Sequence, residues 1–389
     1  MCMKVIFEAQ HLCIPNLRGI ASYAINLIHA LHQRGKNEYA LTFFDKNKER
    51  KNKEKHIAPL FNQLNLHYYE CNDLSYKTAQ DDDFLYKDKS YNEHTGAYGD
   101  IFHFMNPHGV PSNIKGSLVA TVHDVIPLIL PQMFPQMFPQ MFLRSIQRIE
   151  EKEVCVIADS KCTKNDILNY TNINENNINI IYCGYNKAMC YPDKNKKILD
   201  GLNIQGDYLL FLAAIDLRKG INKILEAFTI IALKYPHLKL VIAGGKASNV
   251  KNFGKIINPL NELYCHPYIE RIIITDYVTE EQKRVLMSNA LAFIFPSLYE
   301  GFGIPVLEAM ACGCPVITSN TSSLPEVVGD AAILINPTDV EQLIYETERI
   351  ILSDSLRNEL HHKGLKRASL FSWEKAAEET EDVYRKAVM

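Results

Sequence analysis

The sequence of 389 residues lacks a long apolar run and lacks a strong excess of charge of either sign. No run approaches the ~20 consecutive apolar residues of a membrane-spanning helix. The N-terminal MCMKVIFEAQHL also has no charged region followed by the apolar stretch of a signal peptide. With 42 basic and 45 acidic residues, the formal net charge of −3 gives no overall attraction to nucleic acid. We therefore expect a cytoplasmic protein without a nucleic-acid partner.

Cysteine is sparse as well, with ten residues dispersed along the chain. Cys155 and Cys183 lie in apolar, strand-like runs, which favours buried free thiols over a disulfide framework. Cys312 and Cys314 are separated by one residue, and no second pair of cysteines or histidines stands at the spacing of a zinc site. We expect a reduced protein with no metal site.

The composition and the pattern of apolar runs indicate an α/β protein of two domains. The sequence is 47% hydrophobic and 22% charged, as in globular proteins, and its length exceeds the ~100–200 residues of one domain. Short apolar runs alternate with helical or polar segments, which is typical of strands buried on both faces of a parallel sheet. The predicted strands are Lys4–Ala9, Tyr39–Phe44, Asp100–Phe104, Leu118–Asp124, Val154–Asp159 and Asn177–Tyr182, then Tyr208–Ala214, Leu238–Gly245, Arg271–Asp276, Leu291–Pro296 and Cys314–Ser319.

A polar, Lys-rich segment at Tyr185–Gln205 separates the two series of strands. Such a segment is typical of a linker between domains. We therefore predict two doubly wound, Rossmann-like domains, at residues 1–187 and 188–372.

The most informative segment is Phe295–Ser319, FPSLYEGFGIPVLEAMACGCPVITS. It leaves a predicted strand, turns through Gly301 and Gly303, and enters a helix with Pro305 in its first turn, where proline is tolerated. Loop amides and a helix N-terminus at the carboxyl edge of a parallel sheet stabilise an anionic group. The segment therefore predicts a phosphate site.

Two carboxylates flank this turn, Glu300 before it and Glu308 within the helix, with seven residues between them. Carboxylates accept hydrogen bonds from sugar hydroxyls. One loop and helix could thus hold two sugars joined through phosphates. The alternative is structural: Glu300 caps the helix and Glu308 is the partner of a buried cation.

A cationic counterpart stands in the first unit of the second domain. In AAIDLRKGINKILEAF, Arg218 and Lys219 follow a predicted strand and precede a helix. At that edge they can neutralise the charge that develops on a diphosphate leaving group.

These motifs, YEGFGIPVLEAMACGCPVITSNTSSLPEVVGDAA, DLRKG and the closing FSWEKAAEETEDVY, resemble the group-1 family of retaining, nucleotide-sugar-dependent glycosyltransferases. The resemblance covers essentially the whole chain and is strongest from Tyr208 to Tyr384. It implies the GT-B fold, in which two Rossmann-like domains face a cleft. It also implies that the C-terminal helix, residues 373–389, packs back on the first domain.

The resemblance implies roles for individual residues of the second domain. Lys219 and Arg218 would bind the donor diphosphate, Glu308 the nucleotide ribose, and Glu300 the donor sugar. Amides at Phe302, Gly303 and Ile304 would complete the site, and Asp276, Tyr277 and Val278 resemble the segment that holds the base.

In the first domain, RGIASYAINLI resembles the glycine loop of the family, with Gly19 as the matching glycine. The pattern departs after that, because Ile20, Ala21 and Ser22 stand where a second glycine and an arginine are common. VATVHDVIPL resembles the segment that lines the first-domain cleft, and the match implies a catalytic role for His123. A lone histidine is otherwise more often a packed or capping residue.

The resemblance implies transfer of a hexose with retention, without a metal or another cofactor. The HDVIPL segment is similar to that of members that transfer mannose from GDP-mannose in surface-polysaccharide assembly. The alternatives are a UDP-hexose or UDP-N-acetylhexosamine donor, or a non-catalytic GT-B partner subunit. An NAD-dependent dehydrogenase is disfavoured because no G-x-G-x-x-G follows the first predicted strand.

Two further segments bear on the acceptor, which we expect to be an oligosaccharide or a lipid-linked saccharide. Lys46–Lys55 carries six basic and two acidic residues and is either a solvated loop or a patch for an anionic membrane surface. Pro131–Phe142 contains three tandem PQMF units, whose prolines are expected to exclude a regular helix. Its Met and Phe side chains either pack normally or meet a hydrophobic acceptor at the inner face of the membrane.

Overall fold

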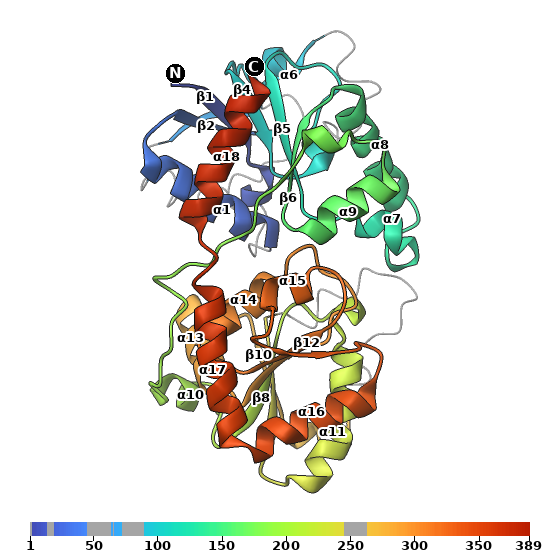
Figure 1. The fold of residues 1–389 in the computed structure, drawn as a ribbon, viewed down its shortest axis with the longest axis vertical. Helices are drawn as coiled ribbons and strands as arrows, with labels where there is room; N and C mark the ends of the chain where they lie inside the picture. The colour runs from blue at the N-terminus through green and yellow to red at the C-terminus, as the bar shows by residue number, and fades with distance from the viewer. Residues whose placement is uncertain (1, 14–18, 45–63, 65, 72–88, 245–262) are drawn as a thin grey trace. The chain divides into compact units, whose positions relative to one another are not determined.

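The computed structural model of the chain describes residues 2–13, 19–44, 64, 66–71, 89–244 and 263–389. The chain divides into two compact units, Met1–Gly184 with Trp373–Met389, and Tyr185–Ser372. The first unit is therefore built from two separate segments of the chain (Figure 1). The basic stretch Lys46–Lys55 lies outside the described residues.

The first unit contains a parallel sheet of seven described strands in the order β3-β2-β1-β4-β5-β6-β7. Its central strands are buried because helices cover both faces of the sheet (Figure 1). The strands are β1 (Lys4–Glu8), β2 (Glu38–Phe44), β3 (His67–Cys71), β4 (Ile101–Phe104), β5 (Ser117–Val122), β6 (Cys155–Ala158) and β7 (Ile178–Ile180). The helices are α1 (Gly19–Arg34), α6 (Tyr91–Thr95), α7 (Ile126–Ile129), α8 (Phe138–Glu151), α9 (Lys161–Tyr170) and α18 (Trp373–Ala387).

Helix α18 packs against α1 and supplies polar groups to the interior of the first unit (Figure 1). The hydroxyl of Tyr384 lies 2.8 Å from Nδ1 of His103, and Nε2 of that ring lies 2.9 Å from the hydroxyl of Thr121 on β5. Burial lowers the pKa of His103 to about 3, so the ring is neutral and bridges the two hydroxyls. Glu381 of α18 is fully buried and lies 3.1 Å from Nε of Arg34 on α1. The last helix is thus part of the core of this unit.

The second unit contains a parallel sheet of six described strands in the order β10-β9-β8-β11-β12-β13. Apolar residues of the central strands are almost fully buried, as in the first sheet. The strands are β8 (Tyr208–Leu212), β9 (Lys239–Ala243), β10 (Ile272–Asp276), β11 (Ala292–Phe295), β12 (Val316–Ser319) and β13 (Ile333–Ile335). The helices are α10 (Lys197–Gly201), α11 (Ile221–Lys234), α13 (Glu280–Asn289), α14 (Ile304–Ala311), α15 (Leu324–Val328), α16 (Val340–Leu352) and α17 (Asp354–Ala368).

Two edge strands, β3 and β13, were absent from the prediction. Strand β3 is His67–Cys71, and its first two side chains are exposed, so it lacks the apolar run of a strand buried on both faces. Strand β13 has only three residues. Sequence patterns built on two-sided burial therefore find the centre of each sheet and miss these edges.

The expectation that the PQMF units exclude a regular helix is wrong for the third unit. Helix α8 begins at Phe138, and Pro139 stands in its first turn, where a helix needs no N–H donor. The first of the three PQMF repeats forms a short 3-10 helix at Pro131–Met133. Met137 and Met141 are 62% and 41% exposed. Within the described residues, the helices are too short or too polar to cross a bilayer.

The cysteine prediction agrees with the structure at most positions. Cys183, Cys312 and Cys314 are buried thiols that form no disulfide, whereas Cys155 is only partly buried. Burial raises the pKa of Cys183 and Cys314, so both thiols stay protonated.

Candidate functional site

The order of the second sheet brings the two predicted motifs together. Strands β8 and β11 are neighbours, so the turns that follow their carboxyl ends meet at one edge of the sheet. The turn after β8 contains a short 3-10 helix, η5 (Leu217–Lys219), and the turn after β11 contains Glu300. The backbone N–H of Leu298 donates to the carbonyl of Arg218 at 2.8 Å, which joins the two turns directly.

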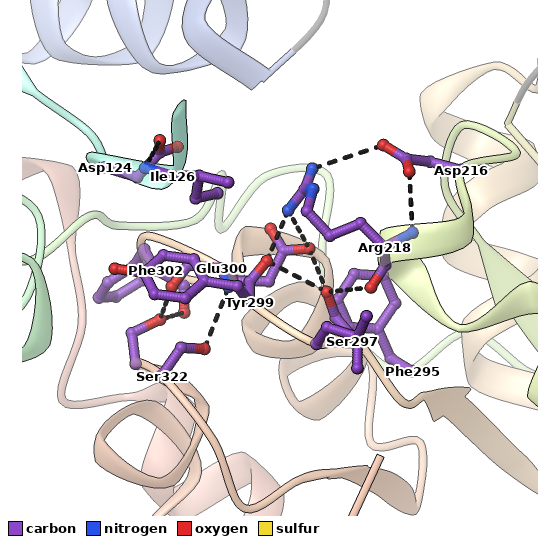
Figure 2. A network of polar contacts seen from close by, with 12 residues as sticks. Asp124, Ile126, Asp216, Arg218, Phe295, Ser297, Tyr299, Glu300, Phe302 and Ser322 are labelled. Carbon is purple, nitrogen blue, oxygen red and sulfur yellow. Dashed lines mark hydrogen bonds and ion pairs between the residues drawn. The ribbon is translucent and has the colours of Figure 1, made fainter. Parts of the chain in front are cut away.

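Arg218 is the centre of the polar network in Figure 2. Its Nη1 donates to the carbonyl of Tyr299 at 2.5 Å and lies 3.3 Å from Oε1 of Glu300. Asp216 caps η5 by accepting from the backbone N–H of Arg218 at 2.9 Å, and its Oδ2 lies 3.8 Å from Nη2. Ser297 donates to Glu300 at 2.8 Å. The predicted cation and the first predicted carboxylate therefore form one hydrogen-bonded group.

The loop that carries Glu300 is fixed by two serines that follow β12. The N–H of Glu300 donates to Oγ of Ser322 at 3.0 Å (Figure 2). The hydroxyl of Ser323 donates to the carbonyls of Glu300 and Phe302, at 2.8 and 2.9 Å. Such side-chain bonds to backbone groups hold the loop in one conformation.

Two glycines of the site have backbone conformations that other residues rarely adopt. Gly220 follows η5 with φ of +75°, and a Cβ there would lie 2.2 Å from the carbonyl oxygen of Pro296. Gly303 precedes α14 with φ of +100°, and a Cβ there would lie 2.7 Å from Leu324. The close approach of the two turns therefore requires glycine at position 220.

The N-terminus of α14 presents backbone donors at this edge. Gly303 is its N-cap and Pro305 stands in its first turn, without a side-chain cap. Within the described residues, the amides of Gly303 and Ile304 have no acceptor. The structural alternative for Glu300 is thus wrong, because Glu300 does not cap the helix. The donors can hold an anion.

The second predicted carboxylate, Glu308, lies on α14 and pairs with a lysine. Its Oε1 is 2.8 Å from Nζ of Lys283 on α13, and the two side chains are 13% and 12% exposed. Burial raises the pKa of Glu308, although the charge and hydrogen bond of Lys283 oppose this effect. The same environment raises the pKa of Lys283, because its carboxylate neighbours outweigh burial. The second half of the structural alternative, a buried cation as the partner of Glu308, is therefore present.

Lys219 is next to Arg218 in η5, and its Nζ lies 5.5 Å from the centre of the Phe295 ring. This geometry is that of a cation–π contact. The Lys219 charge therefore lies beside the carboxyl end of β11, where the Glu300 loop begins.

Asp276 ends β10 and is a non-glycine residue with a positive φ, of 54°. Its carbonyl accepts from the N–H of Gly244 at 2.8 Å. Tyr277 is 59% exposed and Val278 is buried. The three residues thus lie where the chain leaves β10 at the carboxyl edge of the same sheet, two strands away from β8.

In the first unit, His123 follows β5 and uses both ring nitrogens within that unit. Nδ1 lies 2.6 Å from Oδ2 of Asp159, and Nε2 lies 3.0 Å from the carbonyl of Met105. Burial lowers the pKa of His123, but the charge of Asp159 and its hydrogen bond outweigh burial and raise it overall. Because both partners are acceptors, the ring fits best as a doubly protonated imidazolium.

Gly19 is the first residue of α1, and a Cβ there would meet nothing within 4 Å. No positive φ requires glycine at this position. The structure therefore gives Gly19 no steric reason to be glycine.

Sequence reasoning missed several residues of this site: Asp216, Lys283, Ser297, Ser322 and Ser323. Asp216 had a detectable signal, because an Asp two residues before Arg218 is typical of a capping turn. The serines and Lys283 act across separations of 3 to 25 residues in the hydrogen bonds given above, for which a single sequence offers no pattern. Within the described ranges, no group of three His, Cys, Asp or Glu residues could hold a metal ion.

Comparisons with known proteins find similar sequences and a similar fold. Residues 195–367 match the family described as "Glycosyl transferases group 1". O-antigen chain mannosyltransferase B of Escherichia coli is 33% identical over 182 residues, which are 46% of this chain and 45% of that protein. The serotype-specific mannosyltransferase WbdA of Escherichia coli is 26% identical over 270 residues, which are 68% of this chain and 33% of that protein. The chain thus spans less than half the length of these curated relatives.

Among solved structures, a sucrose-phosphate synthase from Thermosynechococcus elongatus superposes with a TM-score of 0.75 and covers 98% of both chains at 19% identity. This likeness shows the fold, as predicted: two parallel-sheet α/β units of the GT-B type. The chain therefore has the GT-B fold, and its residues 195–367 match the group 1 glycosyl transferases, with mannosyltransferases among the curated relatives of the chain.

Proposed function

We propose that the protein is a retaining glycosyltransferase that moves mannose from GDP-mannose to a saccharide acceptor in the synthesis of a surface glycan. The observation that carries this proposal is the single sheet edge of the second unit. There Arg218, Lys219, the amides before α14, Glu300 and Glu308 stand on turns joined by direct hydrogen bonds or on the adjoining helix. Cations and amides suit a diphosphate, and the carboxylates suit sugar hydroxyls.

In the proposed reaction, the bond between C1 of the sugar and the diphosphate oxygen breaks while a bond from C1 to the acceptor oxygen forms on the same face. The proton of the acceptor hydroxyl passes to an oxygen of the departing diphosphate. Arg218 and Lys219 stabilise the negative charge of that leaving group, which is the role that a metal ion has in other transferases. Glu300 orients the donor sugar, Glu308 binds the ribose, and Asp276, Tyr277 and Val278 hold the base.

The choice of mannose rests on the relatives, because the two curated proteins described above are both named mannosyltransferases. A UDP-hexose or UDP-N-acetylhexosamine would fit the same cations and amides, because these groups meet the diphosphate and not the base. The donor titration below therefore includes both nucleotides.

The first unit is proposed to bind the acceptor and to act on the donor through His123. Since both ring nitrogens of His123 already have acceptors, its contribution is a fixed positive charge at the end of β5. Gly19 is proposed to let the donor approach the start of α1, where a side chain at this position would occupy open space.

A lipid-linked acceptor and a peripheral contact at the cytoplasmic face of a membrane are also part of the proposal. Helix α8 and the residue before it expose Met137, Met141 and Leu143, with the exposed Arg144 following directly. Apolar side chains next to a cation suit an anionic lipid surface.

The test is calorimetric titration of the protein with GDP, UDP, TDP and ADP and their sugar conjugates, with and without EDTA. Lys219→Ala is compared with Lys223→Ala, which removes a partly exposed lysine of α11 that pairs with Glu226. We expect selective binding of GDP-mannose that is indifferent to EDTA, lost in Lys219→Ala and kept in Lys223→Ala. Selective binding of another nucleotide sugar would show that the donor is not GDP-mannose. Binding of none, or binding without turnover, would favour a non-catalytic subunit.

A further inference from the structure

We propose that Lys283 is a positioning residue of the donor site: it holds one oxygen of Glu308 so that the other is presented to a ribose hydroxyl. This inference rests on the proposed function, in which Glu308 binds the nucleotide ribose. It assigns a role to a residue of α13 that belongs to neither sequence motif.

The geometry places Lys283 between two carboxylates. Its Nζ lies 2.8 Å from Oε1 of Glu308 and 2.8 Å from Oε2 of Glu280. Lys283 and Glu308 are largely buried, at 12% and 13% exposure, whereas Glu280 is 53% exposed. A buried ammonium group is costly unless it is paired. The inner pair, Lys283 with Glu308, is therefore the one that fixes geometry, and Glu280 completes the coordination from the solvent side.

The pair leaves Glu308 with one oxygen to offer. Lys283 donates to Oε1, and among the described residues no donor bonds Oε2. Glu308 lies on the second turn of α14, and side chains of a helix tilt toward its N-terminus. That end carries the amides of Gly303 and Ile304. A diphosphate at those amides would thus have a carboxylate acceptor one turn away, at a position suited to the sugar next to it.

The charge of Glu308 depends on the same contact. The titratable groups that act on the pair among the described residues are Glu280 on α13 and Cys190 on the segment before α10, whose thiol is hydrogen-bonded to Cys312. Burial raises the pKa of Glu308 and the charge of Glu280 adds to this rise, whereas Lys283 opposes it. Without Lys283 the carboxyl group would protonate at a higher pH. A protonated carboxyl group would present a donor where a ribose hydroxyl needs an acceptor.

The experiment compares GDP with 2′,3′-dideoxy-GDP by calorimetry, on the full chain and across pH. The dideoxy nucleotide keeps the base and the diphosphate and lacks the hydroxyls that Glu308 would bind. We expect Lys283→Met to weaken GDP binding about 10- to 100-fold, which matches the ~1.5–3 kcal/mol of a hydrogen bond to a charged group. We expect it to change binding of dideoxy-GDP less than about twofold. The remaining affinity of Lys283→Met for GDP should rise with pH more than that of the wild type.

Three variants complete the design. Lys283→Arg keeps the positive charge and is expected to restore most of the discrimination between the two nucleotides. Glu280→Gln removes only the exposed partner of Lys283 and is expected to leave discrimination unchanged. Lys234→Met removes another paired lysine of the same unit, whose Nζ lies 2.7 Å from Glu348, and controls for general effects on stability.

The outcomes separate this inference from the proposed function. Equal loss of both nucleotides in Lys283→Met, or no loss of GDP, would overturn the role of Lys283 while the wild type still binds GDP. If Lys283→Met does not fold, the neutral variant Lys283→Gln takes its place, and nearly equal binding of the two nucleotides to it, beside a discriminating wild type, would support the inference. Retained discrimination in Lys283→Gln at every pH, without a shift in its pH dependence, would overturn the inference. A wild type that binds neither GDP nor UDP would overturn the proposed function itself.

Discussion

The guanidinium of Arg218 bridges the carbonyl of Tyr299 and the carboxylate of Glu300, so that a residue after β8 holds the loop after β11. We expect Arg218→Lys to break this bridge, because an ammonium group keeps the charge but not the planar fork that reaches both acceptors. The expected effects are a loss of about 1 kcal/mol in stability and at least a tenfold fall in kcat. Thermal unfolding and steady-state kinetics measure the two effects. A variant with normal turnover would show that Arg218 acts only through its charge.

The close contact between the turns after β8 and β11 leads to a specific prediction for Gly220. Gly220→Ala must accommodate a Cβ at 2.2 Å from a backbone oxygen, in addition to a left-handed backbone. Gly206→Ala is the matched control, since Gly206 has a φ of +78° and nothing within 4 Å of the added Cβ. We expect the control to lose about 1 kcal/mol and Gly220→Ala to lose at least about twice as much. Urea unfolding measures both losses. Equal losses would mean that the turn moves aside at little cost.

Glu8, at the end of β1, makes the stability of the first unit depend on pH. Burial raises the pKa of this carboxyl group to about 7, although a hydrogen bond from the N–H of Gln10 opposes the effect. The folded chain therefore binds the proton more tightly than the unfolded chain, so stability falls as pH rises from about 4.5 to about 7. Glu8→Gln removes this dependence. We expect its advantage over the wild type to grow by about 3 kcal/mol across that interval, as measured by urea unfolding at several pH values. A constant difference would contradict the raised pKa.

Asp159 stabilises the charged form of His123 in the same unit. The pKa of His123 is raised in the folded chain, so the stabilisation is complete below its unfolded pKa of about 6.5 and is lost as pH rises through the folded value. We expect Asp159→Asn to cost about 3 kcal/mol at pH 6 and less at higher pH, because it leaves a buried imidazolium without its anion. NMR titration of the His123 ring checks the cause. An unchanged pKa in the variant would refute this account.

The centre of each sheet and the main site motif could be predicted because their signals are local. Central strands such as β1, with Phe7, and β11, with Phe293, are buried on both faces and therefore consist of apolar runs. The turn at Gly303 and the helix with Pro305 follow from backbone requirements that only these residue types meet. Arg218 and Glu300 were placed at the same sheet edge for the same reason: each follows the carboxyl end of a parallel strand.

The remaining features depend on contacts between distant segments. Lys283 was not predicted, because nothing in TEEQKRV distinguishes a lysine that pairs with α14 from one on a solvated helix face. The role of Ser322 depends on the path of the chain after β12, which sets which backbone N–H it meets. The resemblance implied a catalytic role for His123 but not the acceptors that the fold provides for both of its nitrogens. Sequence spacing carries no information about the groups that Lys283, Ser322 and His123 contact in the fold.

Because α18 follows the second unit in the sequence but belongs to the first, the second unit can fold before the first during synthesis on the ribosome. Tyr384 and Glu381 fill the interior beside His103 and Arg34, and both are fully buried. Residues Tyr185–Ser372 form one continuous segment and can close their core as soon as they emerge. Residues up to Gly184 are made before that segment, and one side of α1 stays uncovered until α18 has been made.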